Sequence, residues 1–152
     1  MSLPLQQQIE SLARPLVEGA GAFIVEVAIR GERSGKVVEL YIDADGAVTS
    51  SLCADISRSL SSALDAENLV QGKYQLVVSS PGIDRPIKYP RQYRKHIGRK
   101  LEVKHSTNGV PGKSEGTLVR ADEKVIELNM KAGTSLVLPI GDVLEAFVIA
   151  PW

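Results

Sequence analysis

Hydrophobic residues recur every three or four positions near the start of the chain, which predicts one buried face of a helix. The stripe consists of Leu5, Ile9, Leu12 and Leu16. Gly19 and Gly21 follow it and end the helix. Apolar residues then alternate with polar ones in residues 23–30 and again in residues 36–42, on either side of a polar loop. This pattern predicts a β-hairpin, with one face of its first strand formed by Phe23, Val25, Val27 and Ile29.

A second helical stripe begins after a turn at residues 43–46. It consists of Leu52, Ile56, Leu60 and Leu64. Thr49 or Ser50 can cap the start of this helix by accepting a hydrogen bond from one of its first amides. Residues 68–72 end it, and residues 73–79 have the alternation of a third strand. The first 80 residues are therefore predicted to fold as α-β-β-α-β, with two helices stacked on one face of a three-stranded sheet.

A proline-rich turn interrupts this regular pattern after the third strand. Pro81 and Gly82 suit the central positions of a type II turn, in which glycine takes the positive φ. Proline pushes the residue before it into an extended conformation, so the turn should be stiff. Its structural residues are Ser79, Ser80, Pro81, Gly82, Asp84 and Pro86. We place the domain boundary here, with an N-terminal domain at residues 1–83, a connector at 84–89 and a second domain at 90–152.

The second domain is predicted to begin with a short helix at residues 90–97, followed by short strands. The strands are expected at residues 100–105, 115–121, 124–130, 135–138 and 144–150. Asn108-Gly109 and Pro111-Gly112 mark a long hairpin loop between the first two. Five short strands in about 60 residues favour a small barrel, because closure removes exposed strand edges. The fold class is α+β.

Composition narrows the class of protein. The chain has 152 residues, of which 43% are hydrophobic and 24% charged, which is typical of a folded protein. No apolar run approaches the ~18 residues of a membrane span, and the first residues lack the pattern of a signal peptide. We therefore expect a cytoplasmic protein that makes no membrane contact and is monomeric when free. Its single cysteine, Cys53, cannot form an internal disulfide.

The net charge of zero hides an asymmetry between the two halves. Residues 1–80 have six basic and ten acidic residues, whereas residues 81–152 have twelve basic and eight acidic ones. Most of the excess lies in residues 85–104, which we call the basic segment. Its cations are Arg85, Lys88, Arg91, Arg94, Lys95, Arg99, Lys100 and Lys104, with Glu102 as the one acidic residue. Such a local excess attracts polyanions, although many charged runs are simply solvated surface.

A search for reactive groups gives no active site. The two histidines, His96 and His105, are interpreted as structural, and none of the common nucleotide, metal-protease or hydrolase motifs occurs. Residues 43–46 resemble the start of a calcium loop, but the glycine comes two positions early and Ala54 replaces the closing glutamate. Cys53 lies beside the apolar stripe of its helix and is interpreted as a small core residue. We expect no enzymatic activity, no cofactor and no metal.

The basic segment instead favours a binding function. Its lysines and arginines have the spacing to follow phosphates along a nucleic-acid backbone. Tyr89 and Tyr93 could stack on unpaired bases, but they share one side of the predicted helix with Ile97, which favours a core role for all three. These residues predict an RNA-binding module without identifying its RNA.

Two stretches carry a resemblance to a known family. They are Tyr41-Ile42-Asp43 with its following glycine, threonine and cysteine, and the longer run Val78-Ser79-Ser80-Pro81-Gly82-Ile83-Asp84-Arg85-Pro86. Together they closely resemble the ribosome maturation factor RimP family, over nearly the whole chain. The chain departs from the family pattern at Ser51-Leu52 and at Val77, where acidic residues are usual, and contacts made by those carboxylates are in doubt.

The resemblance implies an N-terminal α/β domain joined to a C-terminal SH3-like (Sm-like) barrel. It also implies a non-enzymatic factor that binds the immature small (30S) ribosomal subunit and assists its assembly. Ribosomal RNA and small-subunit ribosomal protein twelve would be its partners. Two alternatives stay open, namely an adaptor whose basic surface binds an acidic protein rather than RNA, and a small enzyme with an unrecognised site.

Overall fold

The computed structural model describes residues 3–32, 35–82 and 85–150 of the chain. The chain divides into two compact units, residues 1–81 and residues 82–152, which we call the N-terminal and C-terminal units. The sequence predicts an N-terminal domain that ends at residue 83 and a connector that begins at residue 84, and both of these residues lie outside the described residues. The division into residues 1–83, 84–89 and 90–152 stays a prediction.

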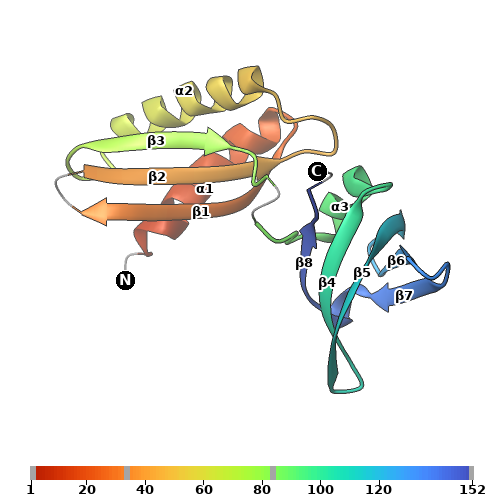
Figure 1. The fold of residues 1–152 in the computed structure, drawn as a ribbon. Helices are drawn as coiled ribbons and strands as arrows, with labels where there is room; N and C mark the ends of the chain where they lie inside the picture. The colour runs from red at the N-terminus through yellow and green to blue at the C-terminus, as the bar shows by residue number, and fades with distance from the viewer. Residues whose placement is uncertain (1–2, 33–34, 83–84, 151–152) are drawn as a thin grey trace. The chain divides into compact units, whose positions relative to one another are not determined.

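The N-terminal unit has the predicted order of helix, strand, strand, helix and strand (Figure 1). Its elements are α1 (Leu5–Gly19), β1 (Phe23–Glu32), β2 (Gly35–Asp43), α2 (Ser50–Ala66) and β3 (Tyr74–Ser79). The described strands form one sheet in the order β1-β2-β3, in which β1 is antiparallel and β3 parallel to β2. Both helices lie on the same face of this sheet, as predicted.

The core of this unit lies between the helices and the sheet. Its fully or nearly fully buried members include Ile9, Ala13 and Val17 of α1, Ile56, Leu60 and Leu64 of α2, and Val38, Leu40 and Ile42 of β2. Burying each of the valine, leucine and isoleucine side chains among them stabilises the fold by about 1.5–3 kcal/mol. The predicted stripe of α2 is confirmed, and Thr49 caps the helix by accepting a hydrogen bond from the amide of Leu52 at 3.1 Å.

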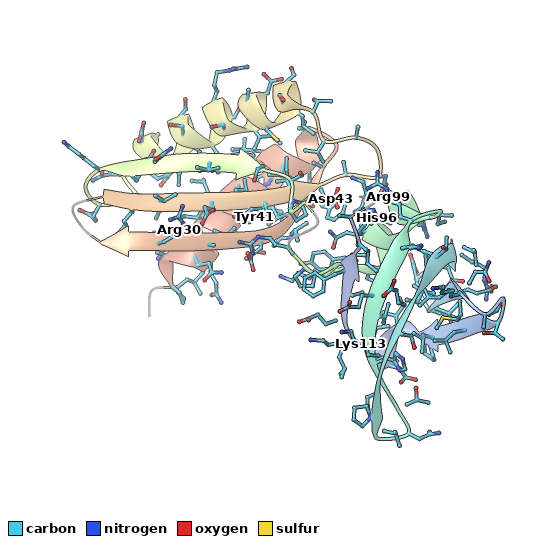
Figure 2. The ribbon with its side chains drawn as sticks, in the orientation of Figure 1. Arg30, Tyr41, Asp43, His96, Arg99 and Lys113 are labelled. Carbon is cyan, nitrogen blue, oxygen red and sulfur yellow. The ribbon has the colours of Figure 1, made fainter. Side chains whose placement is uncertain are left out.

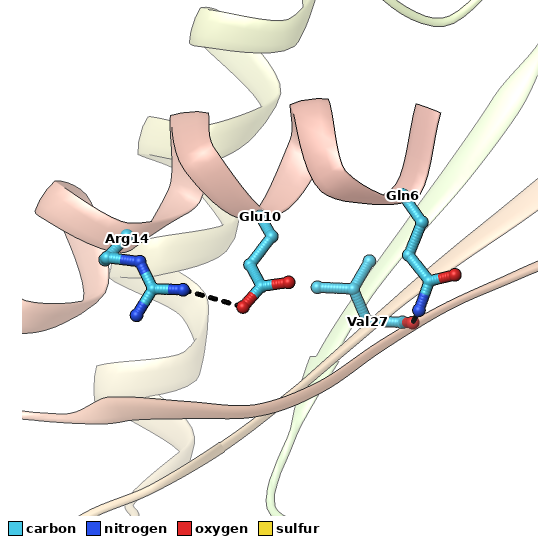
Figure 3. Close-up of polar contacts among 4 residues, drawn as sticks. All are labelled: Gln6, Glu10, Arg14 and Val27. Atoms are coloured by element: carbon cyan, nitrogen blue, oxygen red, sulfur yellow. Dashed lines mark hydrogen bonds and ion pairs between the residues drawn. The ribbon is translucent and has the colours of Figure 1, made fainter. Parts of the chain in front are cut away.

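Polar contacts also hold α1 against the sheet and along its own axis (Figure 3). The side-chain amide of Gln6 donates to the carbonyl oxygen of Val27 in β1 at 2.6 Å. Arg14 pairs with Glu10, one turn earlier on the helix, at 2.7 Å. The ion pair is exposed and contributes little, whereas the bond from Gln6 links two elements.

The face assigned to the first strand is partly wrong. The register of β1 with β2 shifts between Ile24 and Glu26, which is a β-bulge. A bulge places two residues of one strand opposite one residue of the other and so reverses the alternation beyond it. Ile24 and Val27 therefore share the face that packs against the helices, and the buried Phe23 and Val25 lie outside that core cluster.

The C-terminal unit begins with a short helical segment and continues as a sheet. Its elements are α3 (Pro90–Tyr93), the 3-10 helix η1 (Arg94–His96), β4 (Lys100–Thr107), β5 (Val110–Ala121), β6 (Val125–Met130), β7 (Ser135–Pro139), the 3-10 helix η2 (Ile140–Asp142) and β8 (Val143–Val148). The described strands pair antiparallel in the order β7-β6-β5-β4-β8. A single core cluster lies within this unit, with Leu101, Val103 and Leu118 completely buried.

Two local predictions for this unit are wrong. The helix predicted for residues 90–97 is α-helical only as far as Tyr93 and then tightens into η1. The long hairpin loop is absent from the described residues, because Pro111 and Gly112 pair with β4 inside strand β5. Only Asn108 and Gly109 separate the two strands, and both have positive φ, at 53° and 80°. Two successive residues of this kind form a type I′ turn, whose twist matches that of the strands.

Candidate nucleic-acid interface

All eight predicted phosphate-binding residues lie in the C-terminal unit. Arg85 and Lys88 precede α3, Arg91 lies in α3, Arg94 and Lys95 lie in η1, Arg99 lies in the turn before β4, and Lys100 and Lys104 lie on β4. Arg85 and Lys95 are half-buried and the other six are exposed. Arg94, Arg99 and Lys100 form no ion pair with any residue that the structure describes. Their charges are available to a ligand.

Backbone hydrogen bonds fix the helical part of the basic segment to the sheet at both ends. Before α3, the amide of Ile87 donates to the carbonyl oxygen of Ala146 in β8 at 2.8 Å. After η1, the amide of Gly98 donates to the carbonyl of Leu118 in β5 at 2.7 Å, and the amide of Leu118 donates to the carbonyl of Arg99 at 2.9 Å. Figure 2 labels Arg99 at this end of β4. The backbone that bears the cations between these two points is therefore fixed by hydrogen bonds at both ends.

Gln92 provides a third anchor. Its side chain is 3% exposed, and its Oε1 accepts hydrogen bonds from the amides of Lys88 at 2.9 Å and Tyr89 at 2.8 Å. These bonds satisfy two amides ahead of α3, which has Pro90 as its first residue. This role could not be predicted from the sequence, because a glutamine among the arginines of the basic segment has the pattern of an exposed polar residue.

The tyrosines have different environments. Tyr93 is 3% exposed and belongs to the core of the C-terminal unit, and this burial raises its pKa to about 12. It is therefore a core residue. Tyr89 is half-buried, and the Lys88 ammonium lies 5.4 Å from the centre of its ring, within the range of a cation–π contact. Ile97 was predicted to share their buried side but is 49% exposed, since it follows the end of η1.

The exposed face of β4 is electrically mixed. Lys104 pairs with Glu145 of β8 at 3.5 Å, and Glu102 pairs with Lys113 of β5 at 3.2 Å. Figure 2 labels Lys113 on the β4–β5 hairpin. Because Glu145 of β8 lies next to Lys104, this face has less excess positive charge than the sequence of β4 alone indicates. The positive charge of the basic segment that has no ion-pair partner among the described residues lies at Arg94, Arg99 and Lys100.

The predicted turn lies where the two units divide. Gly82 has a φ of 65°, the left-handed value that a type II turn needs at this position. Ser79 and Pro81 are half-buried, while Ser80 and Pro86 are exposed. Asp84, the remaining predicted turn residue, lies outside the described residues.

The other candidate reactive residues have structural environments. Cys53 is half-buried against the core of the N-terminal unit, and burial raises the pKa of its thiol. His105 Nε2 lies 2.9 Å from the hydroxyl oxygen of Ser114, and His96 is half-buried in η1. The buried Asp43 accepts a hydrogen bond from the amide of Ala44 at 2.8 Å. A raised thiol pKa reduces the thiolate that nucleophilic chemistry requires.

Within residues 3–32, 35–82 and 85–150, no group of three or more histidine, cysteine, aspartate or glutamate side chains could hold a metal ion. No described helix is both long and apolar enough to cross a membrane.

Comparison with known proteins identifies the N-terminal unit. Residues 12–84 match the family model described as the RimP N-terminal domain. The matched region begins within α1 and ends two residues after the Val78-Ser79-Ser80-Pro81-Gly82 stretch. The matched part of the chain, residues 12–84, belongs to the RimP family.

One RimP relative extends the match. The protein named ribosome maturation factor RimP from Pelodictyon phaeoclathratiforme is 36% identical over 105 residues, which is 66% of this chain and 61% of that protein. The aligned part of the chain thus spans about three fifths of this relative's length. The family expected from the two sequence stretches is therefore confirmed. The name of this relative describes it as a factor in ribosome maturation.

Proposed function

We propose that the chain is a non-enzymatic assembly factor that binds the immature small (30S) ribosomal subunit in the cytoplasm and assists its maturation. The observation that best supports this proposal is that Arg94, Arg99 and Lys100 are exposed cations on a segment whose backbone is hydrogen-bonded to β5 and β8. The name of the Pelodictyon relative supports the ribosomal context. No cofactor or metal is needed for this function.

The mechanism rests on phosphate recognition by a preformed surface. Arginine binds two phosphate oxygens at once, and Arg94 and Arg99 are the exposed arginines without an ion-pair partner among the described residues. Because the backbone around them is already bonded, little of it has to be ordered on binding. Ribosomal RNA that presents phosphates at the matching spacing is bound more tightly, and this difference in affinity shifts the subunit towards that arrangement.

The C-terminal unit provides the protein-binding part of this function. We propose that its antiparallel sheet closes as an SH3-like barrel and that its remaining surface contacts small-subunit ribosomal protein twelve. The bulge in β5 between Leu118 and Arg120 supports closure, since bulges bend strands sharply. The protein is monomeric when free and acts by binding alone, without covalent chemistry.

An adaptor that binds an acidic protein is the second candidate. It is favoured by the lysines of β4 and β5, because both Lys104 and Lys113 already pair with carboxylates. In that case association with ribosomal particles would survive nuclease treatment. An enzyme is disfavoured by the raised pKa of Cys53, the one cysteine of the chain.

Removing two arginines tests phosphate binding. The double variant Arg94→Ala/Arg99→Ala should bind free small subunits more weakly in sucrose-gradient sedimentation. Each lost phosphate contact lowers the slope of log affinity against log salt by about 0.7–0.9 in magnitude, so the double variant should lose about 1.5. The double variant Lys124→Ala/Lys131→Ala is the matched control, since both lysines are exposed in the same unit outside the basic segment. An unchanged slope for the arginine variant would contradict phosphate contact.

A further inference from the structure

A groove of about 540 Å³ lies in the N-terminal unit between the start of α2 and strand β3. One wall consists of Val48, Thr49, Ser50, Cys53, Ala54 and Ser57, and the other of Leu76, Val77, Val78, Ser79 and Ser80. Figure 1 shows β3 at the edge of its sheet with α2 beside it. Neither the family match nor the proposed RNA contact gives this groove a function.

The lining shows that the groove follows the edge of β3. Side chains of successive strand residues point to opposite faces of a sheet. Residues 76–80 are consecutive, yet all of them line the same groove. This arrangement occurs where a groove runs along the backbone edge of a strand, so the backbone of β3 forms part of its wall.

The backbone groups at this edge have no partner among the described residues. The amide of Lys36 in β2 bonds to the carbonyl of Lys73, which fixes the phase of the parallel ladder. In such a ladder alternate residues direct both N–H and C=O to the neighbouring strand. Gln75 and Val77 therefore face β2, whereas the N–H and C=O groups of Leu76 and Val78 face the groove.

The two edges of this sheet differ in their protection against pairing. Natural edge strands are usually shielded by charged residues, proline or a bulge. Strand β1, at the other edge, has the bulge at Val25 and the charged residues Glu26 and Arg30. Strand β3 consists of Tyr-Gln-Leu-Val-Val-Ser, without a charge or a proline, and its described residues show no bulge. Its edge is thus open to another strand.

The side chains that line the groove indicate which class of ligand it can bind. None of the lining residues is charged, and they combine small apolar side chains with serine and threonine hydroxyls. A nucleic acid would require cations here, so RNA does not fit. We propose that this groove, the β3-edge groove, binds an extended, uncharged peptide segment of a protein partner by strand addition. The segment accepts and donates backbone bonds at Leu76 and Val78, and its alternate side chains contact Val48 and Cys53.

Random peptides of about 12 residues displayed on phage, selected on the full chain, test this binding. We expect enrichment of sequences with alternating apolar residues and without charge. Ser57→Trp fills the groove and should weaken binding of the selected peptides by about tenfold or more. Ser59→Trp, on the exposed side of the same helix and outside the lining, should bind like the wild type. Ala54→Trp is a second blocking variant, since Ala54 is exposed and its replacement leaves the core untouched.

Two readouts locate the bound peptide. Hydrogen exchange of the Leu76 and Val78 amides should slow on binding, whereas the Val77 amide should change little because it is already bonded to β2. Reaction of Cys53 with a thiol reagent should also slow, since this side chain lines the groove.

Several outcomes would overturn the proposal. They are the enrichment of no peptide, equal binding by the Ser57→Trp and Ser59→Trp variants, and loss of binding in Arg94→Ala/Arg99→Ala instead. A wild-type dimer in sedimentation equilibrium that Ser57→Trp dissociates would also overturn it, by identifying a second copy as the occupant. The salt dependence of small-subunit binding is measured separately, so failure here leaves the proposed RNA contact intact.

Discussion

The side chain of Gln92 accepts hydrogen bonds from two successive amides, those of Lys88 and Tyr89, while being 3% exposed. Replacing it by leucine keeps a side chain of similar size but removes the oxygen that accepts both hydrogen bonds. Because each of these partly buried hydrogen bonds contributes about 0.5–1.5 kcal/mol, Gln92→Leu should lower the free energy of unfolding by about 1–3 kcal/mol. Urea unfolding measures this loss, and hydrogen exchange of the two amides should accelerate.

The exposed Gln71 provides the control for this substitution. Gln71→Leu changes the same functional group where water can replace it, so its stability should stay within about 0.5 kcal/mol of the wild type. Equal stability of the two variants would mean that the side chain of Gln92 does not hold the start of α3.

Tyr93 gives the C-terminal unit a dependence on alkaline pH. Burial raises its folded-state pKa to about 12, above the ordinary value of 10.0. Between these values the unfolded chain has lost the phenol proton and the folded chain has kept it, so stability decreases as pH rises. The contribution is fully present below pH 10 and is lost towards pH 12, with a slope of roughly 1.4 kcal/mol per pH unit.

The Tyr93→Phe variant isolates this effect, because it keeps the ring and removes the ionising group. We expect its urea midpoint to fall less than that of the wild type between pH 9 and pH 11. Parallel curves for the two proteins would show that Tyr93 ionises as readily in the folded chain as in the unfolded one. Tyr93→Ala should instead lose about 3–5 kcal/mol at neutral pH, as expected for a buried aromatic residue.

At the scale of elements, the sequence predicts what depends on local spacing. The stripe of α2, the hairpin, and the order α-β-β-α-β followed by short strands all follow from residue periodicity. The stripe of α1 follows only in part, because Ile9 is buried together with Ala13 and Val17 while Leu5, Leu12 and Leu16 are half-buried beside them. The face of β1 does not, because nearly every residue from Ala22 to Val27 is apolar and several registers would bury hydrophobic groups. The bulge between Ile24 and Glu26 is set by pairing with β2, which is a contact between residues far apart in the sequence.

In the candidate site, too, features that depend on local sequence could be predicted, whereas those that depend on contacts between distant residues could not. The sequence identifies the cations of the basic segment, since their number is visible in it. It does not give their partners, because the pairing of Lys104 with Glu145 depends on the register of β4 with β8. The role of Gln92 and the tightening of the helix after Tyr93 also depend on packing in the C-terminal unit. The strongest part of the predicted interface is therefore narrower than the basic segment itself.

At the scale of the whole molecule, the conformation at Gly82 joins the two compact units. Its φ of 65° is strained for residues with a side chain, although no atom stands within 4 Å of the position that a Cβ would occupy. Gly82→Val should therefore cost about 1–2 kcal/mol through the backbone alone, without any steric clash. If the stiff turn also has the predicted role in binding, small-subunit association in a sucrose gradient should weaken in this variant.

Gly82→Asn separates these effects, because asparagine tolerates the left-handed region better than valine does. We expect its thermal stability and its small-subunit association to lie between those of the wild type and Gly82→Val. If Gly82→Val has the thermal stability and the sedimentation of the wild type, the turn has neither of the roles assigned to it. If stability falls but small-subunit association is unchanged, Gly82 is needed only for folding. The exposed cations Arg94, Arg99 and Lys100 would then suffice for binding.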